Sequence, residues 1–160
     1  YYSFFDTAVA RFLLANGVAE ADFNTYGTRR GNHVVARRAT FANIQLRNEA
    51  AAGPAGSFAR VMPDGARMPL FEAAEEYRRR GVPLLVVAGK EYGCGSSRDW
   101  AAKGPKLLGV RVVVAESFER IHRTNLVSVG ILPVQFPVGT TRATLALDGG
   151  ETFDLPRLAA

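Results

Sequence analysis

Residues 84–99 read LLVVAGKEYGCGSSRD, and this stretch decides the expected fold. Its apolar part, residues 84–89, has the length and branching of a buried strand. Two glycines follow, Gly93 and Gly95, and glycine lets a backbone turn closely around a ligand. Residues 100–103 then resemble a short helix that a Gly-Pro pair would end. The pattern predicts a strand, a turn and a helix, with a candidate site in the turn.

The end of this turn carries groups suited to an acidic ligand. Ser96 is followed three residues later by Asp99, which fits a capping box. The amides and partial positive charge of a helix start favour a carboxylate or a developing anion. Arg98 adds a planar guanidinium that matches a carboxylate. From the residues alone a second interpretation stays open, in which Ser96 is only a helix cap and Arg98 a surface ion-pair partner.

Strand and helix patterns alternate on both sides of this stretch. The helix pattern over residues 69–80 is the clearest, because its apolar side chains fall on one face and Gly81 and Pro83 follow it. The other expected elements are a helix over 6–16, an irregular polar segment over 21–38, a flexible connection over 50–57, strands over 110–115 and 130–136, a helix over 117–127 and a hairpin over 143–155. Residues 40–46 are left open between a strand and the approach to a helix. The alternation predicts an α/β domain with parallel pairing, finished by antiparallel strands.

Length and composition indicate one folded domain over residues 1–160. The 160 residues are 48% hydrophobic and 22% charged, which is typical of a soluble globular protein and not of a disordered one. No apolar run approaches the length of a membrane span, so no membrane partner is expected. The first residue is Tyr1, so we expect a processed product, a fragment or an incompletely represented polypeptide.

The charge balance permits anionic partners without identifying one. The net charge is +5, and arginines cluster at residues 29–30, 37–38 and 78–80. The last cluster ends a helix pattern, where cations complement the helix dipole and need no ligand. RNA or DNA binding is therefore possible but not indicated.

The cysteine and the two histidines limit the chemistry of the chain. Cys94 is the single cysteine, which excludes an internal disulfide and favours a reducing, cytoplasmic location. One thiolate cannot hold an iron–sulfur cluster. We expect Cys94 to be a small, partly buried turn residue. His33 and His122 have no ligand-type neighbours at metal-binding spacing, and His122 is expected to pack or cap within its helix.

Four blocks of the sequence, taken in order, resemble the C-terminal swivel domain of the aconitase family, in its bacterial and cytosolic branch. They are residues 22–33 (DFNTYGTRRGNH), 40–48 (TFANIQLRN), 90–104 (KEYGCGSSRDWAAKG) and 115–126 (AESFERIHRTNL). The resemblance runs from about residue 10 to residue 136. It implies a compact swivel domain with a mixed sheet or β-barrel flanked by helices, present as a fragment or small subunit of a larger enzyme.

The resemblance also implies an activity and roles for residues of the turn. The family dehydrates and rehydrates a tricarboxylate, citrate to isocitrate through cis-aconitate, and this chain would be inactive alone. Ser96 matches the family's general base, Ser97 would give the substrate a hydrogen bond, and Arg98 would hold a substrate carboxylate. The complete enzyme would contain a 4Fe-4S cluster, with its ligands in cluster-bearing domains or a large subunit and none in this chain.

The sequence leaves alternatives open for single residues and for the function. Asn16 stands where some relatives carry a further substrate arginine, so the alignment slips there, Arg29 or Arg30 takes the role, or substrate binding differs. Arg29 and Arg30 either line a cleft or interface or simply pair with carboxylates. The enzyme alternatives are relatives acting on methylcitrate or isopropylmalate, although residues 99–103 favour aconitase. RNA binding, as in cluster-free cytosolic relatives, is the alternative of a different class.

Overall fold

Helices and short strands alternate along the computed structural model, which describes residues 7–95 and 98–155. The helices are α1 (Ala8–Ala15), α2 (His33–Ala39), α3 (Leu70–Arg79), α4 (Arg98–Leu108) and α5 (Arg120–Ser128), with single 3-10 turns η1 (Glu20–Asp22) and η2 (Glu49–Ala51). The strands are β1 (Phe58–Val61), β2 (Ala66–Pro69), β3 (Leu84–Ala88), β4 (Val110–Ala115) and β5 (Leu132–Gln135). This order confirms the α/β class.

The described strands form two separate sheets. In the first, β4 lies between β3 and β5 and is parallel to both, with Val113 opposite Val86 on one side and Pro133 on the other. Helices α4 and α5 are the crossover connections that parallel neighbours require. In the second sheet, β1 and β2 form an antiparallel hairpin. Over the described residues the three-stranded sheet is open, and the parallel and antiparallel pairs do not share one sheet.

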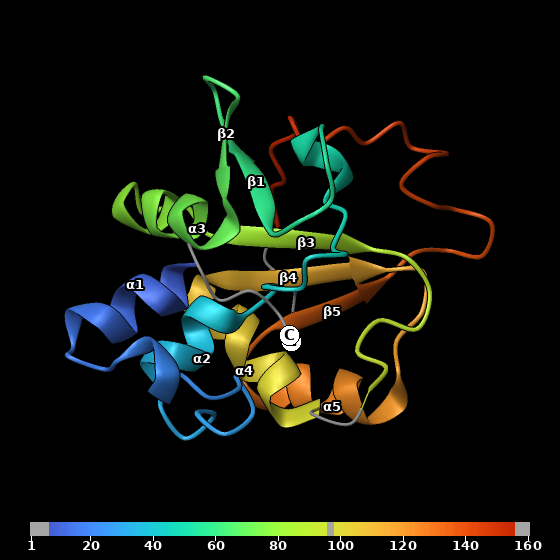
Figure 1. The fold of residues 1–160 in the computed structure, drawn as a ribbon. Coiled ribbons are helices and arrows are strands. Elements are labelled where there is room, and N and C mark those ends of the chain that lie inside the picture. Colours follow the sequence, from blue (N-terminus) through green and yellow to red (C-terminus); the bar gives the residue numbers. More distant parts are fainter. Residues whose placement is uncertain (1–6, 96–97, 156–160) are drawn as a thin grey trace.

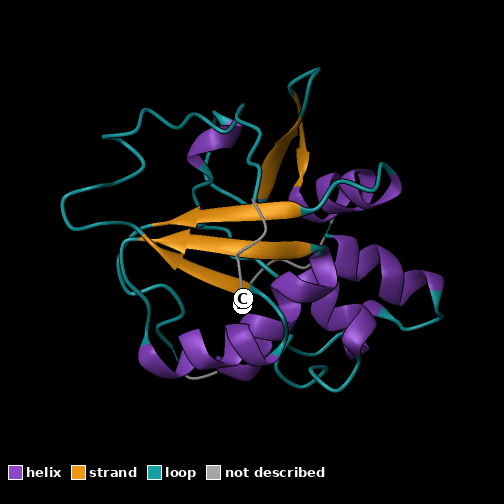
Figure 2. Cartoon of the chain, turned by 180° about the vertical axis from the view of Figure 1, so that it is seen from behind, coloured by secondary structure: helices purple, strands orange, loops and turns teal. Residues whose placement is uncertain are grey.

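Four of the five described helices gather on one side of the parallel sheet, and α3 lies next to the β1–β2 hairpin (Figure 1). Figure 1 shows α1, α2, α4 and α5 below the sheet and the β1–β2 hairpin above it, and Figure 2 shows the same arrangement from behind. The buried side chains of Ala102, Val113 and Leu126 join α4, β4 and α5 into one core cluster. A second cluster, which includes Leu13 and Val35, joins α1 to α2.

The clearest sequence patterns are confirmed. Helix α3 begins after its N-cap residue Pro69 and buries Ala73 and Ala74, as its apolar face predicts. The three expected strands are β3, β4 and β5, and the helix expected over residues 117–127 is α5. The first helix is confirmed with Thr7 as its N-cap, because the Thr7 side chain accepts a hydrogen bond from Ala10 N; its expected first residue, Asp6, lies outside the described residues.

One helix is longer than predicted, and another lies where none was predicted. Helix α4 does not stop at Gly104 and Pro105 but runs through both to Leu108. The pair is buried, and Gly104 lies so close to Thr40 that an added Cβ would be 2.3 Å from its Oγ1. Close packing against the segment after α2 therefore explains the glycine without a helix end. Segment 21–38 is also not wholly irregular, because Asn32 Oδ1 accepts from the first amides of α2 and starts a helix there.

The hairpin expected over residues 143–155 is wrong. These residues form turns and irregular structure, without a strand in the described part. Thr141 and Thr144 fix the start of the segment, since each backbone N–H donates to the other side chain's Oγ1. The antiparallel pair lies in the middle of the chain instead, at residues 58–69. Residues 40–46, left open before, form turns.

Candidate functional site

The glycine-rich turn follows the carboxyl end of β3 and leads into α4. In parallel sheets this end of the strands is where ligands usually bind, because loops of neighbouring strands meet there. Residues 89–95 are described, and α4 begins at Arg98. Ser96 and Ser97 lie outside the described residues, as does the side chain of Arg98. The roles predicted for these three residues therefore remain predictions. The contacts of the preceding residues, 89–95, show how the turn is held in place.

The loop after β4 fastens the turn. Tyr92 N donates to Ser117 O (2.9 Å), and Glu119 N donates to Tyr92 O (3.0 Å). Ser117 also accepts at its Oγ from Glu91 N (2.7 Å). The Tyr92 ring makes an edge contact with Phe118, 6.1 Å between ring centroids. Burial raises the pKa of Tyr92 to about 12, so its phenol stays protonated at neutral pH.

Gly93 touches a buried histidine, His122 of α5. Its φ of 89° lies in the left-handed region, and an added Cβ would be 2.0 Å from His122 Cγ. The His122 side chain is 1% exposed and its ring lies 5.3 Å from that of Tyr92. His122 therefore packs inside the molecule, as predicted. The glycine that was expected to make room for a ligand makes room for this imidazole.

A cavity of about 480 Å³ lies beside the turn. Its lining combines four aromatic rings, one arginine and one buried histidine with small residues. The lining residues are Tyr26, Gly27, Arg30, Ala36, Ala39, Thr40, Phe41, Tyr92, Gly93, Trp100, Ala101, Pro105 and His122. The turn, the loop at residues 26–30, the segment after α2 and the helices α2, α4 and α5 thus meet at one place.

Arg29 and Arg30, neighbours in the 26–30 loop, have different surroundings in the structure. Arg29 donates from Nε to Phe23 O (2.7 Å) and from a terminal nitrogen to Asp22 O (2.6 Å), so its guanidinium holds its own loop together. Arg30 donates to Gly27 O (2.8 Å) and lines the cavity. Of the two candidates, Arg30 has the position that contact with a ligand requires.

Three other residues have the following surroundings. Asn16 ends α1, and its side-chain amide donates to Phe12 O (2.8 Å), so it serves as a helix cap. Cys94 is exposed, which corrects the expectation that it is partly buried. His33 is exposed at the start of α2 and borders a smaller cavity of about 280 Å³ with Trp100. The described residues contain no group of three or more His, Cys, Asp or Glu that could hold a metal ion.

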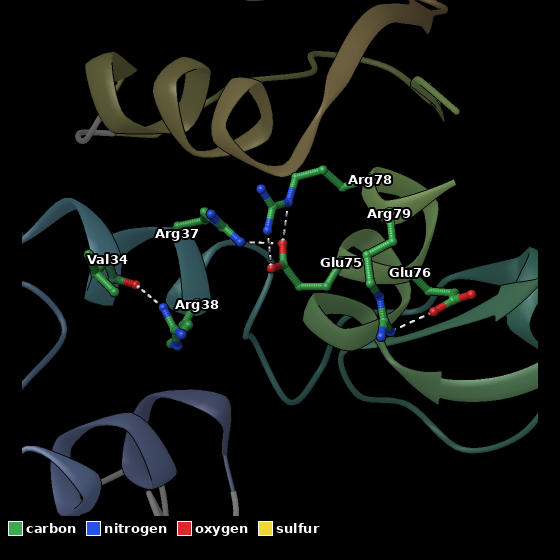
Figure 3. Close-up of polar contacts among 7 residues, drawn as sticks. All are labelled: Val34, Arg37, Arg38, Glu75, Glu76, Arg78 and Arg79. Carbon is green, nitrogen blue, oxygen red and sulfur yellow. Dashed lines mark hydrogen bonds and ion pairs between the residues drawn. The ribbon is translucent and has the colours of Figure 1, made fainter. Parts of the chain in front are cut away.

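The arginine clusters form contacts within the chain. Figure 3 shows the Glu75 carboxylate between Arg37 of α2 and Arg78 of its own helix, while Arg79 pairs with Glu76. Arg38 donates to Val34 O (3.1 Å) and lies over the rings of Phe12 and Phe71. These cations thus have roles in joining α1, α2 and α3, and a nucleic acid is not needed to explain them.

The aromatic and small residues of the cavity were not singled out from the sequence, although a signal for them was present. Ten of the thirteen described lining residues fall within the blocks 22–33, 40–48, 90–104 and 115–126. Only the folded chain brings these blocks together.

Among the described residues, no helix has the length and apolar character of a membrane span.

Comparisons with known proteins relate nearly the whole chain to one family. The family described as the aconitase C-terminal domain matches residues 9–139. The chain is similar to aconitate hydratase A of Escherichia coli (strain K12), 57% identical over 150 residues that cover 94% of this chain and 17% of that protein. It is also similar to aconitate hydratase A of Legionella pneumophila, 56% identical over 144 residues that cover 90% of this chain and 16% of the relative. The chain thus spans about a sixth of the length of these curated relatives.

Proposed function

The chain belongs to the aconitase C-terminal domain family, and we propose that it serves as the swivel domain of an aconitate hydratase-like hydro-lyase. The substrate in this proposal is a tricarboxylate, and the rest of a longer enzyme contributes the remaining groups of the active site. The observation that carries the proposal is the convergence of the four sequence blocks around the cavity beside the turn. Ten of the thirteen described lining residues come from these blocks, which supports a shared role for the blocks at one site.

Ser96 would act as the base in the dehydration step. Its Oγ, as an alkoxide, would take the proton from the carbon next to a substrate carboxylate, and a double bond would form as hydroxide leaves the neighbouring carbon. Rehydration would return the proton from Ser96 while hydroxide adds to the double bond. Ser96 and Ser97 directly precede α4 in sequence, so the partial positive charge of this helix start favours the alkoxide.

The remaining residues of the turn would bind the substrate. Arg98 would hold a carboxylate through its two parallel N–H groups, and Ser97 would donate a hydrogen bond. Arg30, which lines the cavity, is the candidate for a second cation. Asn16, as a neutral helix cap, would not supply one.

Removal of the substrate hydroxyl would belong to the rest of the enzyme. A 4Fe-4S cluster in the complete enzyme would supply a Lewis acid for this step, but such a cluster requires several thiolates and this chain has only Cys94. The residues of this chain therefore do not fit the cluster, which we place in other domains or a large subunit. We infer a cytoplasmic location, because the exposed free thiol suits a reducing compartment. RNA binding is not part of the proposed function.

Steady-state kinetics of the full-length enzyme on citrate and cis-aconitate test the proposal. We expect Ser96→Ala to lower kcat by about 10²–10⁴-fold with little change in KM, because the lost group acts in proton transfer. Arg98→Lys should raise KM as well, because an ammonium cannot replace the paired N–H groups of the guanidinium.

Ser128→Ala and Arg111→Lys are matched controls, since both side chains are exposed outside the turn and the cavity. Both control variants should keep wild-type kinetics. Near-normal turnover of Ser96→Ala, with the cluster fully loaded, would show that Ser96 is not the base.

A further inference from the structure

We infer that His122 is a positioning residue for the turn that carries the predicted base, an inference that rests on the proposed function. His122 belongs to α5 and lies 29 positions after Gly93 in the sequence, yet its ring is the surface on which Gly93 rests. The ring atoms Cγ and Cδ2 both lie 2.0 Å from where a Gly93 Cβ would be. No side chain fits between these two residues, so the ring fixes how close the turn comes to α5.

The same region is held by directional contacts on both sides of Gly93. Before it, Tyr92 exchanges backbone hydrogen bonds with Ser117 and Glu119. Glu119 also accepts from His122 N at its Oε2 (2.8 Å), which joins the start of α5 to the same fastening. After it, Cys94 N donates to Glu91 O (3.1 Å). The backbone conformation around Gly93 is therefore fixed by contacts with the start of α5, and the His122 ring packs directly against Gly93.

This placement affects chemistry because the predicted base follows within three residues of Gly93 in the sequence. A displacement of about 1 Å in a reacting group can lower a rate about 100-fold. The His122 ring also borders the cavity, so removing it would leave space directly under the turn. His122 then acts on catalysis through the turn and need not touch the substrate.

The test compares three variants of the full-length enzyme. His122→Ala removes the ring, and His122→Phe keeps an aromatic ring without nitrogens. Leu126→Ala truncates another buried side chain of α5, 0% exposed, which packs in the core. We measure kcat and KM for cis-aconitate, melting temperature, and amide hydrogen exchange of the peptide spanning residues 90–95.

We expect His122→Ala to lower kcat about 10–100-fold with KM nearly unchanged, and to speed exchange of the 90–95 peptide. His122→Phe should recover most of the lost kcat. Leu126→Ala should lower the melting temperature at least as much as His122→Ala, yet keep kcat and the exchange of this peptide near wild type. If His122→Ala does not yield folded enzyme, His122→Asn, a smaller truncation, is judged by the same criteria.

Two results would overturn the inference. The first is that His122→Ala behaves like Leu126→Ala, with lower melting temperature but unchanged kcat and exchange, because His122 would then be a core residue only. The second is that His122→Phe loses as much kcat as His122→Ala, because the nitrogens and not the ring would then matter. If the wild-type enzyme does not hydrate cis-aconitate, the proposed function fails, and the exchange measurement alone decides whether His122 holds the turn.

Discussion

At the scale of single residues, Gly104 lies inside helix α4, where alanine is normally the better residue by about 1 kcal/mol. Its surroundings reverse this preference. An added Cβ would be 2.3 Å from Thr40 Oγ1 and 3.0 Å from Thr40 Cγ2. Thr40 cannot easily turn away, because its hydroxyl donates to Ala36 O (2.9 Å). From the sequence, Gly104 reads as a helix stop, and only the fold reveals the contact.

We therefore predict that Gly104→Ala lowers the free energy of unfolding by roughly 1–3 kcal/mol, the usual cost of overpacking. In the double variant Thr40→Ala/Gly104→Ala the two nearest atoms, Thr40 Oγ1 and Cγ2, are absent, so part of this loss should be recovered. Urea unfolding of the wild type, both single variants and the double variant measures the coupling. Simple additivity of the two single effects, within about 0.5 kcal/mol, would contradict the prediction.

The position of the turn can be predicted from the sequence, but its contact with His122 cannot. The glycine pair and the buried strand before it predict where the turn lies, because both depend on local chemistry. The partner of Gly93 is His122 on a later helix, and no local pattern indicates that contact. His122 itself is correctly predicted as a packing residue, but its contact with the turn needs the parallel order of β3 and β4.

At the scale of elements, the ion pair between Arg37 of α2 and Glu75 of α3 helps explain why one helix is missed in the sequence. Helix α2 buries only Val35, so it lacks an apolar stripe. Its Arg37 instead bonds to Glu75 of α3, and Arg38 lies over aromatic rings. A hydrophobicity pattern predicts that charged side chains face solvent, but in α2 these arginines make the contacts with neighbouring helices. Helix α3 is predicted because its two buried alanines lie on one apolar face. The three parallel strands are predicted because each lies in a short apolar run of the sequence.

Glu75 gives the α2–α3 contact a pH dependence. Partial burial would raise its pKa, but hydrogen bonds and charge interactions with Arg78 and Arg37 outweigh burial and lower the pKa below its usual 4.5. The folded state then keeps the carboxylate ionised to lower pH than the unfolded state does. Its contribution to stability is complete above the unfolded pKa and is lost as pH falls through the folded pKa.

We predict that Glu75→Gln lowers the free energy of unfolding by roughly 1–3 kcal/mol at pH 7, the usual cost of losing hydrogen bonds to a charged group. This difference from wild type should shrink below about pH 4.5, where the carboxylate begins to lose its charge. Urea unfolding at pH 7, 5 and 3.5 measures it. Asp64→Asn, at an exposed carboxylate between β1 and β2, is the matched control and should show little effect. A difference that stays constant with pH would exclude the ion pairs as its source.

At the scale of the whole molecule, the candidate site exists only because distant segments converge. Tyr26, Phe41, Trp100 and His122 come from four parts of the chain and line one cavity. Neither their spacing nor their residue types predict a common cavity, because the contacts depend on how α2 and α4 pack under the sheet. The hairpin wrongly expected near the C-terminus has a similar origin. A bend is present at Gly149, but residues 142–146 form turns and residues 151–155 are irregular, so the two arms that a hairpin needs do not form in the described residues.

The molecule's single thiol leads to the last prediction. If the chain contributes a base and substrate contacts but no cluster ligand, Cys94→Ser in the full-length enzyme should leave iron and sulfide content and the visible absorption band unchanged. Serine replaces the thiol sulfur with oxygen, which removes the only thiolate that this chain could offer.

The isolated chain, after anaerobic reconstitution with iron and sulfide, should accordingly stay colourless. Metal analysis and absorption spectra check both statements. Loss of iron from the full-length variant, or a cluster band in the isolated chain, would make Cys94 a ligand and place this turn at the cluster itself. Unchanged iron with reduced turnover would instead mean that the packing of this exposed turn residue affects the base beside it, which is a separate effect from cluster binding.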